Sequence, residues 1–231
     1  MPGHRALKEE VRRLLSADDR SQALSEISVY RPRRVINSLI ACFYDSDQLV
    51  RWRAVAAAGE VAAGLADSDR ESARVIMRRL MWMLNDESGG IGWGSPEAMG
   101  EITASSPAMA SEYANILCSF VNPGCNFLEH QGLQRGVLWG LGRLAQAHPQ
   151  RVRAVVQDIV PFFYSKDPVH RGHAAWAAGN AADIRAVGAL EEMFSDKADI
   201  DFFENWHIMR ISVGRLARDA AGRIFQAGRE S

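Results

Sequence analysis

The sequence lacks an excess of charge of either sign. Its 231 residues include 27 lysines and arginines against 28 aspartates and glutamates, which gives a formal net charge of −1. General nucleic-acid binders usually carry a basic excess, so we expect no nucleic-acid partner. The short basic runs at Arg31–Arg34 and Arg78–Arg79 are interpreted as solvated helix faces.

Long apolar runs and cysteines are also scarce. No stretch reaches the roughly 18 apolar residues of a membrane helix, and the N-terminal residues contain no apolar signal core. The cysteines Cys42, Cys118 and Cys125 are odd in number and lack the spacing of a zinc site. These features predict a cytoplasmic protein with no membrane partner, no metal and no need of a disulfide.

Motifs of common enzymes are missing as well. The sequence has no Gly-x-Ser-x-Gly nucleophile elbow, and no cysteine, histidine and acid are placed as a catalytic set. His170 and His173, which flank Arg171, are interpreted as surface or cap residues. We therefore expect no catalytic residues and no cofactor.

What the sequence does contain is a repeat marked by glycine. Five glycines follow one another at intervals of 41, 42, 37 and 35 residues, and this spacing is typical of stacked repeat proteins. Small apolar residues recur one position before each glycine and two and three positions after it, on one face of a helix. We expect this face to pack on neighbouring helices, with each glycine at a close approach: Gly59, Gly100, Gly142, Gly179 and Gly214.

Each glycine-bearing helix is preceded by another apolar helix, and strand signals are weak throughout. The sequence thus predicts an all-α, right-handed solenoid of about five helical hairpins over residues 30–228. Capping helices are expected in residues 4–28, so that residues 1–231 form a single domain. The first helices of the hairpins are predicted at Val35–Tyr44, Ala73–Leu84, Ala110–Phe120 and Val152–Phe163.

The repeat phrases resemble HEAT repeats, in the short form found in phycobilisome lyases. The chain also resembles an uncharacterised bacterial group of HEAT-like proteins with a Gly-Ile-Gly-Trp-Gly insertion. The resemblance implies the fold but not the function, because such repeats serve scaffolds, lyases and hydroxylases alike. It is carried by Val50–Gly59, by Arg171–Gly179, and by Gly142–Ala145 with its echo Gly214–Ala217.

A second stripe, seven and three positions before each glycine and one after it, mixes tryptophans with charges. By the resemblance to HEAT stacks we place this stripe on the concave side, as the binding groove, since Trp and Arg are enriched at binding hot spots. The charge changes from acidic in early units to basic in late ones. Two plainer readings stay open: Glu101 and Arg143 only pair with each other, and the tryptophans are partly core. The candidate groove residues are Trp52, Glu60, Trp93, Glu97, Glu101, Arg135, Trp139, Arg143, Trp176, Asn180, His207 and Arg215.

Two irregular loops interrupt the repeats at equivalent junctions and are therefore expected to be neighbours. The first, residues 85–94, is too rich in glycine for a helix, and Ser95 is predicted to cap the helix that follows. This loop lacks the Gly-Lys-Ser/Thr ending of a P-loop, which leaves a lid over the groove or a plain connection. The second loop covers residues 121–132. The candidate loop residues are Gly89, Gly90, Gly92, Gly94, Cys125 and His130.

The resemblance to HEAT repeats permits one enzyme class to be tested. The hydroxylase of this fold that acts on deoxyhypusine holds two irons with paired His-Glu motifs, and none occurs in the matching slots here. We expect a non-catalytic interaction protein that binds a protein or peptide partner in the groove. The alternative is a tetrapyrrole-handling protein, with Trp93, Trp139 and Trp176 stacking on the macrocycle and an arginine pairing its propionates.

Overall fold

Several of the helices begin at side chains that cap their free backbone N–H groups. Asp47 accepts from the amides of Leu49 (2.8 Å) and Val50 (3.3 Å), and Asp69, Ser106 and Asp167 play the same part for later helices. The computed structural model describes residues 3–85 and 89–229. In that part of the chain the longer helices are α1 (His4–Leu15), α2 (Arg20–Ser28), α3 (Pro32–Cys42), α4 (Gln48–Ser68), α5 (Arg70–Met83), α6 (Ser95–Ser105), α7 (Pro107–Ser119), α8 (Gln131–Ala147), α11 (Pro168–Ala181) and α13 (Val213–Ala227).

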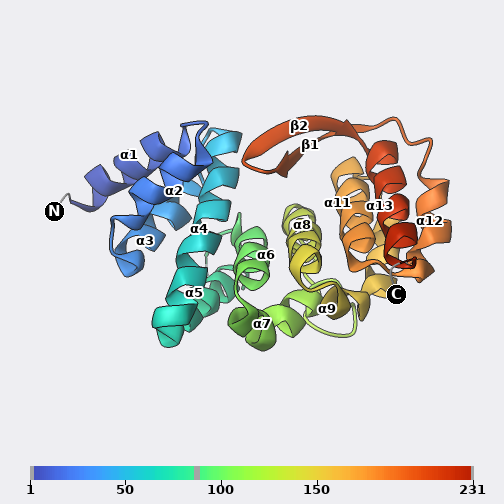
Figure 1. Cartoon of the computed structure of the whole chain (residues 1–231), viewed down its shortest axis with the longest axis horizontal. Helices are drawn as coiled ribbons and strands as arrows, with labels where there is room; N and C mark the ends of the chain where they lie inside the picture. The colour runs from blue at the N-terminus through green and yellow to red at the C-terminus, as the bar shows by residue number, and fades with distance from the viewer. Residues whose placement is uncertain (1–2, 86–88, 230–231) are drawn as a thin grey trace.

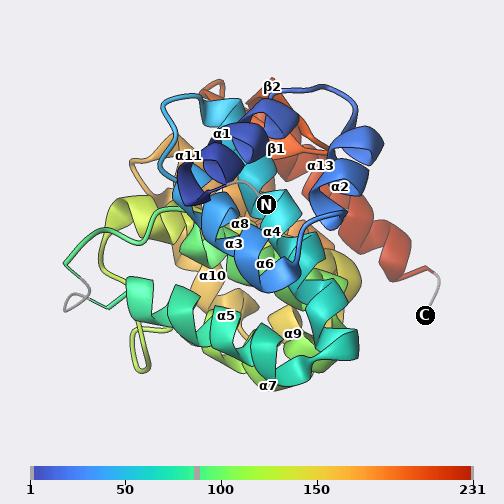
Figure 2. The same ribbon diagram turned by 90° about the vertical axis from the view of Figure 1, so that its left-hand side faces the viewer.

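The helices form the expected α-solenoid of the HEAT/armadillo type. The glycine-bearing helices α4, α6, α8, α11 and α13 stand side by side in an arc (Figure 1), while α5, α7 and α9 (Pro149–Arg153) lie on its outer side (Figure 2). The helix predicted over Val152–Phe163 is broken into the end of α9, α10 (Val156–Ile159) and a 3₁₀ segment. That segment contains Pro161, which has no N–H to donate to a helical turn.

Four of the five repeat glycines lie where neighbouring helices touch. A Cβ on Gly59 of α4 would lie 2.6 Å from Glu101 Cβ of α6, and one on Gly179 of α11 would lie 2.5 Å from Ala220 of α13. A Cβ on Gly100 would lie 2.3 Å from Gly140 of α8, and one on Gly142 would lie 2.0 Å from the Trp176 ring. The prediction of a close approach at these positions is confirmed, because no side chain fits there.

The last unit departs from the prediction. Between α12 (Val187–Glu192) and α13 the chain forms an antiparallel β-hairpin, β1 (Asp199–Glu204) and β2 (His207–Ser212), where the sequence analysis expected helix. The positions aligned there with the groove stripe therefore do not share a helix face: His207 lies on β2 and Arg215 on α13. Ile200, Phe202 and Phe203 of β1 are buried against the helices, which is what holds the hairpin in place.

The hairpin spans the mouth of the arc and joins its two ends (Figure 1). Its two-residue turn has positive φ at both Asn205 (50°) and Trp206 (74°), which is rare for a bulky residue. Contacts hold the turn in this conformation. The buried Arg53 guanidinium of α4 lies 5.4 Å from the Trp206 ring, and its Nε donates to the Trp206 carbonyl (3.0 Å). Trp206 Nε1 in turn donates to the Ala17 carbonyl (3.2 Å) in the α1–α2 connection.

Within residues 3–85 and 89–229, none of the helices combines the length and the apolar character needed to span a bilayer.

Candidate functional site

Two of the predicted groove tryptophans are not on the surface. Trp139 of α8 and Trp176 of α11 are each only 1% exposed, because β1 lies over them. Trp139 Nε1 donates to the Phe203 carbonyl (3.1 Å), and the Trp176 ring packs edge-to-face on Phe202 (5.1 Å). The prediction that these indoles are free to bind a partner is wrong, and their reading as core is confirmed.

Most of the charged residues in the predicted gradient form ion pairs with other residues of the chain. Arg143 forms two hydrogen bonds with the buried Glu101 (3.0 and 2.9 Å), as the plainer reading expected. Among the other stripe residues, Glu60 pairs with Arg20 (2.6 Å), Arg135 with Asp167 (2.6 Å) and Arg215 with Asp219 (2.9 Å), Asn180 donates to the Gly142 carbonyl (3.2 Å), and His207 is exposed on β2.

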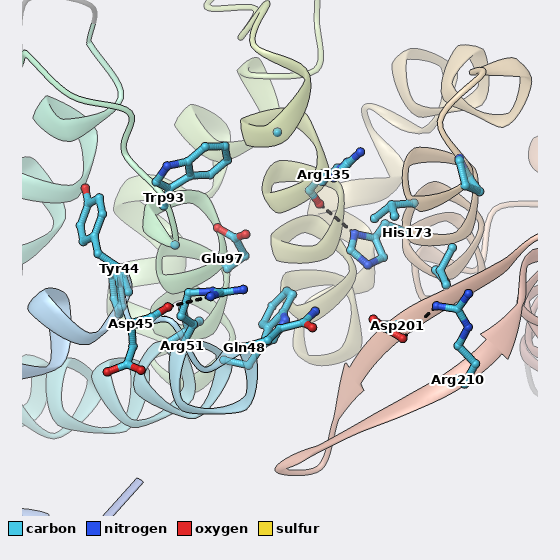
Figure 3. Close-up of a pocket in the computed structure, with 18 of the residues that line it drawn as sticks. Tyr44, Asp45, Gln48, Arg51, Trp93, Glu97, Arg135, His173, Asp201 and Arg210 are labelled. Carbon is cyan, nitrogen blue, oxygen red and sulfur yellow. Dashed lines mark hydrogen bonds and ion pairs between the residues drawn. The ribbon is translucent and has the colours of Figure 1, made fainter. Parts of the chain in front are cut away.

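A cavity of about 720 Å³ lies beside the hairpin and is lined by residues of α4, α6, α8 and α11 (Figure 3). The N-terminal half of the solenoid forms one wall, α8 and α11 form the opposite wall, and the hairpin closes one side. Trp52, Trp93, Glu97 and Arg135 from the predicted groove line it. So do residues that the sequence analysis did not select, among them Tyr44, Asp45, Gln48, Arg51, His173, Asp199, Asp201 and Arg210.

Glu97 is a partly buried acid of this cavity, with one carboxylate oxygen fully shielded. It lies in the first turn of α6, and its Oε2 is shielded from solvent with no hydrogen-bond partner among the described residues. Burial raises the pKa of Glu97 from 4.5 to about 7. Ionised, this carboxylate lacks a counter-charge of its own, which is costly unless a ligand supplies one.

His173 lies on the opposite wall of the cavity from Glu97 (Figure 3). Its Nδ1 is 2.9 Å from the Arg135 carbonyl oxygen. Since a carbonyl only accepts, the proton sits on Nδ1 and Nε2 is an acceptor. Within the described ranges Nε2 is buried without a partner, and burial lowers the pKa of His173 from 6.5 to about 4. The expectation of a surface or cap histidine is wrong, since His170 and His173 are both buried.

Two glycines of α8 make room for the cavity side chains. A Cβ on Gly132 would lie 2.5 Å from the Trp93 ring, and one on Gly136 would lie 2.5 Å from Glu97 Oε1. The two positions are four residues apart and so lie on one face of α8. The indole and the carboxylate are therefore seated against bare helix backbone. The spacing of Gly132, Gly136 and Gly140 in the sequence was a signal that could have located this site.

The two irregular loops are neighbours, as predicted. The Trp93 ring, 39% exposed, packs edge-on against His130 (5.4 Å between centroids), and His130 Nδ1 accepts from the Gly132 amide (3.1 Å) to cap α8. Tyr44 donates from its hydroxyl to the Ile91 carbonyl (3.1 Å) and holds the first loop from the other side. Trp93 thus lies at the edge of the cavity, on a loop that is held by contacts on both sides.

The remaining candidate loop residues are two packed glycines, two exposed glycines and one exposed cysteine. Gly92 packs on the Met83 carbonyl, and Gly94 (φ 75°) packs on the Phe43 ring and takes the cap position of α6 that was predicted for Ser95. Gly89 (φ 75°) and Gly90 are exposed, Cys125 is an exposed free thiol outside the cavity lining, and residues 86–88 of this loop lie outside the described residues. The described part of the chain contains no group of three or more His, Cys, Asp or Glu able to hold a metal ion.

Comparison with known proteins agrees with this architecture. Residues 132–180 match the HEAT-like repeat family. A curated relative, an uncharacterised protein of Archaeoglobus fulgidus, is 28% identical over 198 residues, which cover 80% of this chain and 94% of the relative.

Solved structures of similar fold include engineered proteins and designed armadillo repeat proteins. An engineered protein from the Northeast Structural Genomics Consortium has a TM-score of 0.54 at 16% identity, with 95% of this chain and 98% of that one covered. A designed armadillo repeat protein in complex with the peptide (KR)4 has a TM-score of 0.52 at 15% identity, with 93% and 98% covered. Residues 132–180 thus match a HEAT-like repeat, and the whole chain has the fold of a HEAT/armadillo-like helical solenoid.

Proposed function

We propose that this chain is a non-catalytic binding module that holds a peptide segment of a protein partner in the cavity beside its hairpin. The observation that carries the proposal is the cavity itself, which has an indole on its edge and two buried acceptors, on Glu97 and His173, without partners among the described residues. Binding sites are typically concave, mostly apolar and furnished with a few placed polar groups. A ligand that donates hydrogen bonds would satisfy what the fold leaves unsatisfied.

The cavity is also preorganised. Trp93 and Glu97 are fixed against the bare backbone at Gly132 and Gly136, and Trp93 is held further by His130. Side chains that are already ordered lose little conformational entropy when a ligand binds. Binding in this cavity should therefore cost less conformational entropy than binding on a surface whose side chains must first become ordered.

Repeat solenoids commonly use their concave surface to bind extended peptides. One designed armadillo protein of similar fold is in complex with the peptide (KR)4. At 15% identity that likeness concerns the fold, so it supports the kind of partner and not its sequence. No observation favours the tetrapyrrole alternative. Trp139 and Trp176 are buried, and of the three indoles assigned to the macrocycle only Trp93 lines the cavity.

A matched pair of tryptophan variants tests the proposal. Linear peptides are selected on the wild-type protein from a displayed random library, and their affinities are then measured for Trp93→Ala and Trp82→Ala. Trp82 is 54% exposed on α5 and lies outside the cavity lining. We expect Trp93→Ala to weaken binding about tenfold or more, as removal of an aromatic anchor does, and Trp82→Ala to leave it unchanged.

Circular dichroism of both variants shows whether they keep the helical fold. Selected peptides that bind a folded Trp93→Ala variant as tightly as the wild type would place the binding surface elsewhere and overturn the proposal.

A further inference from the structure

We propose that the cavity recognises a lysine side chain of the partner, with the ammonium group placed between the Glu97 carboxylate and the Trp93 ring. This inference rests on the proposed function and deepens it by naming the chemical group of the partner that the cavity binds. Figure 3 shows the two side chains next to each other on the same wall. They lie four positions apart, where the first loop runs into α6.

The unsatisfied atoms call for a ligand that donates. Glu97 Oε2 and His173 Nε2 are both acceptors, and neither has a partner among residues 3–85 and 89–229. An anion or a second acceptor would leave both unsatisfied and would be repelled by an ionised Glu97. A lysine ammonium carries three donors and a full positive charge, so it supplies both the hydrogen bond and the counter-charge.

The basic groups that face the cavity already have acceptors. From α4, Arg51 donates to the carbonyls of Asp45 (2.6 Å) and Ser46 (3.3 Å). From α8, Arg135 pairs with Asp167, and Arg210 of β2 pairs with Asp201 of β1 (3.0 Å). The other titratable groups on the walls are Tyr44 and Asp45 from the connection between α3 and α4, His173 from α11 and Asp199 from β1.

Among these groups, Glu97 is the acid with a buried carboxylate oxygen that has no partner in the described part of the chain. Asp45 is engaged by Arg12 (2.8 and 3.2 Å), and His173 is neutral near pH 7 because burial lowers its pKa to about 4. A cation that enters therefore finds in Glu97 an acceptor that it can pair without breaking an existing ion pair.

Two details favour lysine over arginine. An arginine fork needs two acceptor oxygens that are both open to it, whereas both Glu97 oxygens lie against Gly136 of α8, each 2.5 Å from where a Cβ on that glycine would stand. A compact ammonium suits a single oxygen. The adjacent indole face adds cation–π attraction and covers the lysine methylenes.

The test uses a small probe, Nα-acetyl-lysine N-methylamide, with its norleucine and arginine analogues. Binding is followed by the indole N–H signals of ¹⁵N-tryptophan-labelled protein. We expect the lysine probe to shift the Trp93 signal, the arginine probe to bind more weakly, and the norleucine probe not to bind. Glu97→Gln should weaken lysine binding about tenfold or more, since hydrogen bonds to charged groups are the strong ones.

Glu191→Gln is the control of matched charge, because Glu191 is exposed on α12 and outside the cavity lining. Protons compete with the ammonium for Glu97, so affinity should fall about tenfold for each pH unit below the Glu97 pKa of about 7. In Glu97→Gln this pH dependence should disappear.

The outcomes separate the inference from the proposed function. If library peptides bind the cavity but ignore both Glu97→Gln and replacement of their lysines by norleucine, the module stands and the lysine assignment is overturned. If the lysine probe binds through Glu97 but no peptide depends on Trp93, the assignment stands and the peptide partner is overturned. Equal binding of the norleucine probe contradicts the ammonium contact.

Discussion

Arg53 and Trp206 are 153 positions apart in the chain, yet the guanidinium of one lies over the indole of the other. Arg53 is fully buried and directs its donors to the carbonyls of Leu15, Ala17 and Trp206 and to the Asp18 carboxylate. One side chain thereby joins the first helices of the solenoid to the hairpin of its last unit.

We expect Arg53→Met to lower the free energy of unfolding by about 3 kcal/mol or more, because several buried acceptors lose their donor at once. Urea-induced unfolding followed by circular dichroism measures the change. Arg74→Met is the control: Arg74 pairs with Glu112 on the outer surface, and such pairs contribute about 0–1 kcal/mol. Equal losses in the two variants would mean that the hairpin contact adds no stability.

The glycine contacts between stacked helices lead to a second prediction. Gly100→Ala should destabilise the fold by about 2 kcal/mol or more, because its methyl would collide with Gly140 backbone of α8. Gly64 of α4 offers the matched control, since a Cβ there meets nothing within 4 Å. Gly64→Ala should raise stability by roughly 0.5–1 kcal/mol, as alanine does in a helix. Thermal unfolding of the two variants should therefore shift in opposite directions.

Glu97 and His173 make stability depend on pH in opposite directions. Burial raises the pKa of Glu97 from 4.5 to about 7, so the folded protein keeps a proton that the unfolded chain releases. The contribution of this carboxyl to stability thus falls as pH rises through that window, by up to ~1.4 kcal/mol per unit. The pKa of His173 is lowered from 6.5 to about 4, so its contribution is lost as pH falls through that range.

We expect the two effects to offset each other in the wild type between about pH 4.5 and 6.5. Glu97→Gln removes one of them, so its stability should fall on acidification through this window and exceed that of the wild type near neutrality. Urea titrations at a series of pH values measure both slopes. Parallel profiles for variant and wild type would contradict the raised pKa of Glu97.

The seat of Trp93 on α8 gives a fourth prediction. A methyl on Gly132 would press on the indole ring, so Gly132→Ala should displace Trp93 and weaken peptide binding about tenfold with little loss of helix content. Gly188→Ala, at a position with nothing within 4 Å of a Cβ, should leave binding unchanged. The ¹⁵N indole spectrum reports the displacement directly, and an unmoved Trp93 signal would contradict it.

The repeat was readable in the sequence because it follows from packing between adjacent helices. Gly59, Gly100, Gly142 and Gly179 each stand where no side chain fits, and the pattern of small residues around them records that constraint. Trp93 and Glu97 are two of the predicted groove residues that line the cavity, and their positions keep phase with the glycine at 100.

The hairpin was missed because its signals are local and weak. Its turn is Asn205–Trp206 and not the Asn-Gly that usually marks such a turn, and contacts with distant residues stabilise it. The burial of Trp139 and Trp176 follows from that hairpin and was therefore equally hidden. His173 escaped selection because its role depends on the Arg135 carbonyl of another helix, which no spacing along the chain reveals.

Tandem arrays ordinarily tolerate gain or loss of an internal copy, since each copy touches only its neighbours. Here the contact between Trp206 and Arg53 requires a fixed distance between the first and last units of the array. An added copy between α6 and α8 would move the hairpin turn out of reach of Arg53. A deleted copy would bring the two ends too close for the same contact. The span of one β-hairpin thus fixes how many copies this array can have.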